Sequence, residues 1–213
     1  MFDFKLFLLL IPSLLLALTV HEFSHGLLAY HLGDPTPKWA GRLTLNPLKH
    51  LDFFGTLTLF LTQAIGWAKP VPINPHYFKN FWRDMALVSL AGPISNLLLA
   101  IVMGLFYHFF NYLYLTFTKL SFLEPLVMMS YLGVRINLGL GIFNLLPIPP
   151  LDGSKILVKF LPQEFRYKFL SYEFIGFFII LILALSGVLS KVIYPVLLFL
   201  TNLVLTYTGI FFR

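Results

Sequence analysis

Apolar runs of roughly 20 residues alternate with short polar segments along this chain, and that alternation limits the folds open to it. A helix that crosses the hydrocarbon core of a bilayer needs about 20 mostly apolar residues. Runs of about that length cover residues 4–30, 85–110, 126–146, 172–189 and 191–212. Only 11% of the residues are charged, against about 25% in soluble domains. We therefore expect an all-α polytopic membrane protein with about five transmembrane helices.

The expected domain organisation is a single membrane-embedded unit over residues 1–213, with core helices over about 4–160 and C-terminal helices over about 172–212. The apolar run 53–65 is short for a crossing, which indicates a re-entrant segment. Before it, residues 41–47 alternate apolar and polar side chains and end at a proline, which predicts a short membrane-associated strand region. A crossing by 53–65 is the alternative, and it would reverse the sidedness of everything that follows.

The basic residues indicate which side of the membrane each loop occupies. If residues 53–65 do not cross, most of the 15 Lys and Arg residues lie in loops on one side. Lys and Arg concentrate on the cytoplasmic side of membrane proteins, which predicts a multi-pass protein of the cell membrane with this side in the cytoplasm. The net charge of +6 then reflects topology. It comes without the basic stripe in a polar fold that indicates a nucleic-acid partner.

The first apolar run contains His21-Glu22-Phe23-Ser24-His25, an H-E-x-x-H pattern. Residues four apart share one face of a helix, so His21 and His25 can bind one metal ion. Glu22 lies beside that face, where it can take a proton from a water molecule at the metal and pass it to a leaving amine. A chance match is the weaker interpretation, because ionisable side chains inside an apolar helix are expensive unless they are paired or bound.

A further ligand must be His, Asp or Glu, because the chain has no cysteine. The strongest candidate is Asp152, in the segment Asn144–Gly153, which reads N-L-L-P-I-P-P-L-D-G. An N-cap for the helix that begins near Ser154 is the plainer interpretation of Asp152. Topology favours a metal-ligand role for Asp152, because with five crossings Asp152 lies near the same membrane face as the two histidines. A sixth crossing would separate them by about 30 Å.

Together the two motifs resemble those of the site-2 proteases, polytopic zinc proteases that cut substrate helices within the membrane. The family signatures H-E-x-x-H and N-x-x-P-x-P-x-L-D-G are both complete and in the expected order, and the similarity covers much of residues 20–160. The resemblance implies that His21, His25 and Asp152 bind one Zn2+ per chain. It makes Glu22 the catalytic acid–base and a transmembrane protein the substrate.

The same resemblance suggests how a substrate is held. It implies that Asn144 positions the substrate or stabilises the oxyanion. The family's membrane-associated strand, thought to pair with an unwound substrate, is matched here by Gly41, Arg42, Leu43, Thr44 and Leu45. Asn96 and Gly92 lie in a stretch similar to the second core helix and near the depth of the site, where small-residue packing explains them equally well. The chain resembles a minimal member, without the PDZ or CBS domain that others carry.

Two other functions stay open, a metal-ion transporter and a catalytically inactive membrane scaffold. A transporter would also place His and Asp within its spans, but it has no need of Glu22 and usually shows internal repeats, which the sequence lacks. An inactive homologue often loses Glu22 or a metal ligand, and the set here is complete. The sequence therefore predicts zinc-dependent hydrolysis of peptide bonds within or near the transmembrane helices of membrane proteins.

Three further polar residues lie in or beside the apolar runs. His50 and Asp52 lie beside the run 53–65, and either could make a hydrogen bond to the imidazole of a zinc ligand without touching the metal itself. Arg135 lies in the middle of the run 126–146, where a charge usually faces the protein interior.

Overall fold

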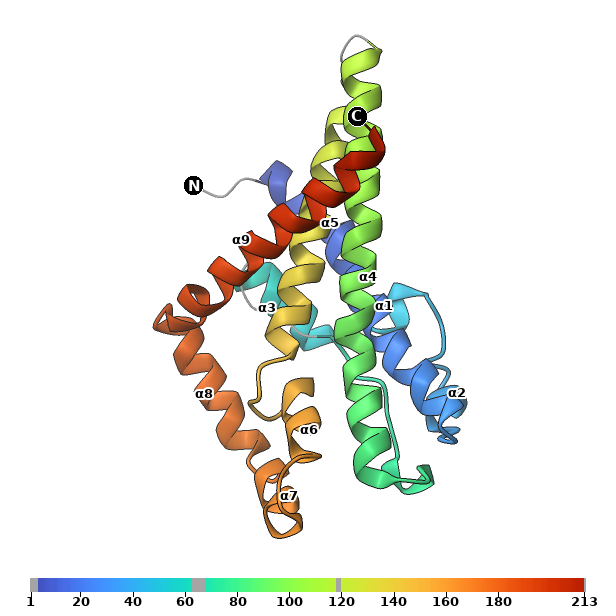
Figure 1. Cartoon of the computed structure of the whole chain (residues 1–213), viewed down its shortest axis with the longest axis vertical. Helices are drawn as coiled ribbons and strands as arrows, with labels where there is room; N and C mark the ends of the chain where they lie inside the picture. Colours follow the sequence, from blue (N-terminus) through green and yellow to red (C-terminus); the bar gives the residue numbers. More distant parts are fainter. Residues whose placement is uncertain (1–3, 63–67, 118–119, 213) are drawn as a thin grey trace.

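The computed structural model of the chain describes residues 4–62, 68–117 and 120–212, and it is built from helices (Figure 1). The α-helices within these residues are α1 (Phe4–His31), α2 (Thr36–Trp39), α3 (Phe53–Thr62), α4 (Phe81–Thr116), α5 (Leu123–Asn144), α6 (Asp152–Val158), α7 (Gln163–Leu170), α8 (Glu173–Leu185) and α9 (Val188–Gly209). The 3-10 turns are η1 (Pro47–Lys49), η2 (Pro75–Tyr77) and η3 (Ile210–Phe212).

Four helical stretches in the described part of the chain are long and apolar enough to cross a membrane: α1, α4, α5 and α9 with η3. α4 has 36 residues and is about 54 Å long, so it extends well beyond a hydrocarbon core of about 30 Å. α7 and α8 are bent by 63° and make a fifth span if the pair is counted as one. The expected all-α polytopic membrane fold is confirmed.

α1, α4 and α5 form the central bundle (Figure 1). Residues four apart share one face of a helix, and each of these helices turns such a stripe toward its neighbours. The buried stripe of α1 contains Ser13, Ala17, His21, His25 and Ala29. The buried stripe of α4 contains Val88, Gly92, Asn96, Ala100 and Gly104. His21 of the α1 stripe lies against Asn96 of the α4 stripe, and the site lies at that level of the bundle.

The C-terminal helices differ from the expected pair of crossings at residues 172–189 and 191–212. α8 has 13 residues and is about 20 Å long, which is too short to cross alone. Gly187 joins it to α9 with φ 74°, a left-handed conformation that glycine adopts readily. α9 then continues toward the opposite end of the molecule instead of turning back beside α8 (Figure 1).

α9 runs in the same direction as α4. Leu200 and Leu97 line one cavity between the two helices, and further along both of them Thr208 lies against Gly104. A cluster of Ala100, Val134, Leu138 and Val204 joins α4, α5 and α9. α1 and α5 run in the opposite direction (Figure 1), so α1, α4, α5 and α9 alternate in direction, as four successive crossings do.

The strand expected over residues 41–47 is wrong. The structure has no strand within the residues it describes, and only an isolated bridge joins Leu51 to Ala68. Side-chain hydrogen bonds to nearby backbone compete with sheet pairing, and here Nε2 of His50 bonds to the carbonyl oxygen of Thr44 at 2.8 Å. The alternating pattern therefore forms an irregular loop.

α3 covers the first part of the apolar run 53–65, and residues 63–65 lie outside the described residues. Its 10 residues span about 15 Å, which is half of the hydrocarbon core. The described part of α3 is therefore shorter than a crossing. That the whole run 53–65 is re-entrant and does not cross stays a prediction.

Candidate metal centre

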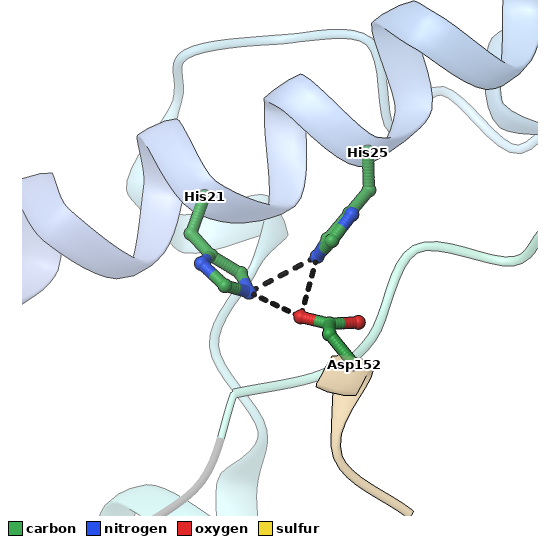
Figure 2. Close-up of side chains that lie close together, drawn as sticks. All are labelled: His21, His25 and Asp152. Atoms are coloured by element: carbon green, nitrogen blue, oxygen red, sulfur yellow. Dashed lines mark hydrogen bonds and ion pairs between the residues drawn. The ribbon is translucent and has the colours of Figure 1, made fainter. Parts of the chain in front are cut away.

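Three ligand atoms meet where α1 faces the start of α6 (Figure 2). His21 and His25 come from successive turns of α1, and Asp152 is the first residue of α6. The two Nε2 atoms are 3.0 Å apart, and Oδ2 of Asp152 lies 3.3 Å from His21 Nε2 and 3.2 Å from His25 Nε2. All three side chains are buried. Folding thus joins two motifs that lie far apart in the sequence.

The triangle has the dimensions of a tetrahedral zinc site. Zinc bonds of about 2.0–2.1 Å place neighbouring ligand atoms about 3.3 Å apart in that geometry. Nδ1 of His25 lies 2.7 Å from the carbonyl oxygen of Val88, and because a carbonyl only accepts, Nδ1 carries a proton and Nε2 is the ring nitrogen that faces Asp152. An imidazole nitrogen and a carboxylate oxygen at this distance attract only across a shared cation, which is either a proton or a metal ion. The donor set therefore fits zinc.

The plainer interpretation made Asp152 the N-cap of the following helix, and the structure places it one residue after the N-cap instead. The N-cap residue of α6 is Leu151, whose side chain makes no capping hydrogen bond. Burial alone would raise the pKa of the Asp152 carboxyl, but its contacts with His21 and His25 and the nearby charge of Lys155 hold that pKa below its usual range. The carboxylate is therefore charged at neutral pH, as a metal ligand must be.

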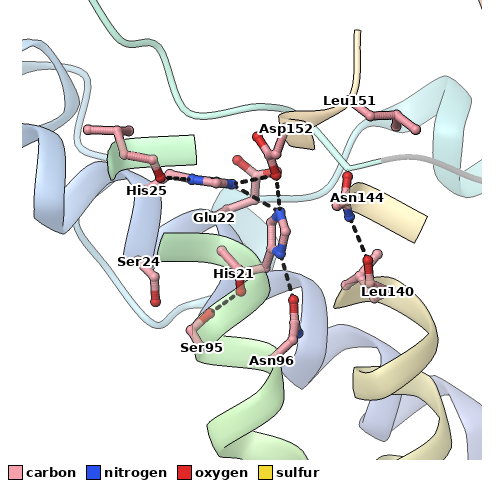
Figure 3. A network of polar contacts seen from close by, with 12 residues as sticks. His21, Glu22, Ser24, His25, Ser95, Asn96, Leu140, Asn144, Leu151 and Asp152 are labelled. Atoms are coloured by element: carbon pink, nitrogen blue, oxygen red, sulfur yellow. Dashed lines mark hydrogen bonds and ion pairs between the residues drawn. The ribbon is translucent and has the colours of Figure 1, made fainter. Parts of the chain in front are cut away.

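Glu22 lines a cavity of about 330 Å³ that the three ligands also line. Its side chain lies beside them (Figure 3), and Oε2 accepts a hydrogen bond of 2.9 Å from the N–H of Val71. Other walls of the cavity come from Ile73 and from Met85 of α4. The carboxylate thus faces the space in which a peptide could meet the ligands.

Asn144 also lines this cavity, as the last residue of α5. Its amide nitrogen donates to the carbonyl oxygen of Leu140 at 3.0 Å (Figure 3). An asparagine amide has two N–H groups, and the second has no partner among the described residues. One donor of Asn144 is therefore available to a ligand in the cavity.

α4 supports both imidazoles from behind. Nδ1 of His21 lies 2.6 Å from Oδ1 of Asn96 (Figure 3). At Gly92 a Cβ atom would lie 2.5 Å from both His21 Cε1 and His25 Nε2, so only glycine leaves room for the two rings. Asn96 is fully buried and does not line the cavity. The structure thus puts it behind a ligand, which differs from the substrate contact that the sequence suggested.

Two supporting groups escaped the sequence analysis. The carbonyl of Val88 bonds to His25, and a backbone carbonyl leaves no trace in the residue type. Asn137 accepts a hydrogen bond of 2.8 Å from Nδ2 of Asn96. A signal for Asn137 did exist, because an amide inside the apolar run 126–146 needs a partner in the membrane.

The structure gives the expected substrate-contact segment a supporting position. None of its five residues lines the cavity: Gly41, Arg42, Leu43, Thr44 and Leu45. The buried guanidinium of Arg42 donates instead to the carbonyl oxygens of Lys69 and Pro70, and Leu43 lies against Gly26 of α1. These side chains thus link the loop to α1 and to the neighbouring segment, which includes Val71 and forms part of the cavity wall.

The other three polar residues lie outside the site. His50 bonds to its own loop, and Oδ1 of Asp52 accepts from the N–H of Gly55 at 2.8 Å, at the start of α3. The imidazoles at the site bond to Asn96 and to the Val88 carbonyl, so the suggested bond from His50 or Asp52 is absent. Arg135 lies over the ring of Tyr131, with its Cζ 5.9 Å from the ring centroid.

Comparison with known proteins gives a consistent result. The model of peptidase family M50 matches residues 9–187. YwhC of Bacillus subtilis, named as a candidate zinc metalloprotease, is 42% identical over 188 residues, which are 88% of this chain and 85% of YwhC. Two proteins named as candidate zinc metalloproteases Rip2 are also similar. That of Mycolicibacterium smegmatis is 32% identical over 87% of this chain and 70% of its own length. That of Mycobacterium tuberculosis H37Rv is 28% identical over 92% of this chain and 74% of its own. No solved structure matches the chain.

Proposed function

Because the chain belongs to peptidase family M50, the site-2 proteases, we propose that His21, His25 and Asp152 hold its zinc and that Glu22 moves the proton during hydrolysis. The protein is a zinc-dependent intramembrane protease, and its substrates are membrane proteins. The observation that carries the residue assignment is the convergence of three ligand atoms at 3.0–3.3 Å on the cavity that Glu22 lines.

A zinc ion bound by these residues would polarise the scissile carbonyl and make a water molecule a better nucleophile near neutral pH. Glu22 takes a proton from the attacking water as the new C–O bond forms. It then gives that proton to the leaving amine as the C–N bond breaks. Glu22 can do both because its carboxylate lies beside the ligands and faces the same cavity.

Substrate positioning is assigned to two elements of the cavity wall. We propose that Asn144 donates its free N–H to the peptide carbonyl or to the oxyanion formed from it. We also propose that the segment around Val71 and Ile73 pairs with the unwound substrate strand. Both residues line the cavity, and the X-Pro steps Lys69-Pro70 and Val71-Pro72 keep this segment out of a helix.

The proposed location is a cell membrane with the site near the cytoplasmic side. The helices α2 and α6–α7 and the start of α4, all of which carry lysine or arginine, lie toward one end of the molecule (Figure 1), and this clustering supports the assignment. Residues 1–213 are proposed to work as one membrane-embedded domain. Residues 4–160 would form the catalytic core, with residues 172–212 as C-terminal helices packed on it.

The test of this assignment compares wild type with Glu22→Gln in detergent, using a panel of single-span membrane proteins as substrates and quantifying bound zinc in both. Glutamine keeps the shape but cannot carry the proton. We expect Glu22→Gln to retain zinc and to cut about 10²–10⁴-fold more slowly. Glu164→Gln, an exposed change in α7, is the matched control and should behave as wild type.

Two results would count against the assignment. If Glu22→Gln cuts at the wild-type rate, Glu22 is not the acid–base. If His21→Ala, His25→Ala and Asp152→Ala each keep their zinc, the ligand set is wrong.

A further inference from the structure

We propose that Asn137, two side chains away from the metal site, is a positioning residue that keeps the proton of His21 on Nδ1, through Asn96, and so leaves Nε2 open to the metal. The inference rests on the proposed ligand set. It goes beyond that set because Asn137 touches neither a ligand nor the cavity of the site.

The polar contacts form a line from α5 through α4 to α1. Nδ2 of Asn137 donates to the carbonyl oxygen of Gly133 at 2.8 Å. Oδ1 of Asn137 accepts from Nδ2 of Asn96 at 2.8 Å, and Oδ1 of Asn96 lies 2.6 Å from Nδ1 of His21. The same Nδ2 of Asn96 also lies 3.2 Å from the carbonyl oxygen of Ala17. Two backbone carbonyls thus end the line opposite the imidazole.

These carbonyls determine which way each amide faces. A backbone carbonyl only accepts, so the nitrogen of Asn137 must face Gly133 and its oxygen must face Asn96. The atom of Asn96 that meets this oxygen must then be nitrogen, and the carbonyl of Ala17 requires the same orientation. Asn96 therefore presents oxygen to His21. An oxygen acceptor selects the imidazole tautomer with its proton on Nδ1, which is the tautomer that binds a metal through Nε2.

Burial makes the line rigid. Asn96 and Asn137 are each 0% exposed, and the cavity beside Asn137 is lined by apolar side chains of α4, α5 and α9. Without Asn137, the orientation of Asn96 depends on the single, longer contact with the Ala17 carbonyl. If the amide of Asn96 turns over, its N–H groups face His21, and the proton of the imidazole moves to Nε2, where it blocks metal binding.

A purely structural role also accounts for these contacts, in which the two amides only hold three helices together. The experiment must therefore separate metal binding and tautomer from stability. Asn137→Leu removes both hydrogen bonds at similar size. Asn137→Asp keeps an oxygen that accepts from Asn96. Ser130→Ala is the matched control, because Ser130 is a buried polar residue of the same helix whose hydroxyl, among the described residues, bonds to Leu126 of its own helix alone.

The first measurement is zinc affinity of the full chain in detergent, by competition with a chelator. We expect Asn137→Leu to bind zinc about 10–100-fold more weakly, which is the effect of removing a residue that orients a metal ligand. Asn137→Asp and Ser130→Ala should stay close to wild type. The inference is overturned if Asn137→Leu binds zinc like wild type, or if Ser130→Ala weakens zinc binding as much as Asn137→Leu does.

The second measurement is ¹⁵N NMR of zinc-free protein with labelled histidine, with the His21 signal identified by its loss in His21→Gln. Wild type should show the Nδ1–H tautomer, and Asn137→Leu should gain the Nε2–H form. This readout tests the idea even if Asn137→Leu folds poorly, because an Nε2–H tautomer in wild type would overturn it. The zinc affinity of His21→Ala distinguishes a failure of the ligand assignment from a failure of the role of Asn137. If that affinity stays at the wild-type value, His21 is not a ligand, and both proposals fail.

Discussion

The central bundle and the C-terminal helices of this protein are held in different ways. In α1, α4 and α5 the buried stripes carry polar side chains that bond from helix to helix, as His21 does to Asn96 and Asn96 to Asn137. α8 has a single buried residue, Gly176, which lies against the carbonyl of Pro149. Most of its other side chains are large, apolar and exposed. In a bilayer such a surface faces lipid.

α9 is held by close packing of small residues against α4. Thr208 and Val204 lie against Gly104, and the ring of His108 lies against Gly209 and bonds to the carbonyl of Leu205. Close approach of backbones at small residues is how membrane helices associate. The two regions therefore differ in what they hold in place: the polar bundle positions the proposed metal ligands, while the C-terminal helices add packing at a distance from them.

The largest effect is expected for Gly92→Ala in the bundle. The added methyl would lie 2.5 Å from His21 Cε1 and from His25 Nε2, so at least one ligand must leave its position. We expect zinc affinity to fall at least about 100-fold and proteolysis to fall with it. Zinc competition and substrate cleavage measure this. Gly139→Ala is the control, because a Cβ there meets nothing within 4 Å. Wild-type zinc affinity in Gly92→Ala would show that the ligands tolerate displacement.

A smaller effect of another kind is expected for Gly104→Ala, three turns further along α4. Its methyl would lie 2.9 Å from Thr208 Oγ1 and 3.0 Å from Val204 Cγ1, which pushes α9 away. Overpacking of this kind costs about 1–3 kcal/mol, and the gain in helix propensity offsets up to about 1 kcal/mol. Thermal unfolding in detergent should show a lower Tm, while zinc affinity stays unchanged. A loss of zinc in Gly104→Ala would mean that the two regions are coupled.

The smallest effect is expected for Asp52→Asn. Its side chain accepts from the N–H of Gly55 at the start of α3, and asparagine is an equally good acceptor there. Zinc affinity should equal that of wild type, and stability should change by less than about 0.5 kcal/mol. A measurable loss of zinc would assign Asp52 to the metal site after all and would extend the polar region beyond the bundle.

Several features of the site could be predicted because they depend on local spacing. His21 and His25 share a helix face whatever surrounds the helix, and their ring nitrogens meet the Asp152 carboxylate in the structure. Asp152 could be inferred because charge asymmetry places its loop on the same side as the histidines. The strand over residues 41–47 failed because alternation is also compatible with a loop closed by its own side chains, as the bond between His50 and Thr44 shows.

The apolar spans and the residue types of the proposed metal centre can be read from the chain before it folds, since hydrophobic length and helical periodicity are properties of neighbouring residues. The direction of α9, the supporting position of Arg42 and the line from Asn137 to His21 emerge only once the helices pack. Each of these depends on contacts between residues far apart in the chain, and pairing between buried polar groups is settled by which helices meet and at what level. The sequence contains the amides, but only packing decides which oxygen meets which proton.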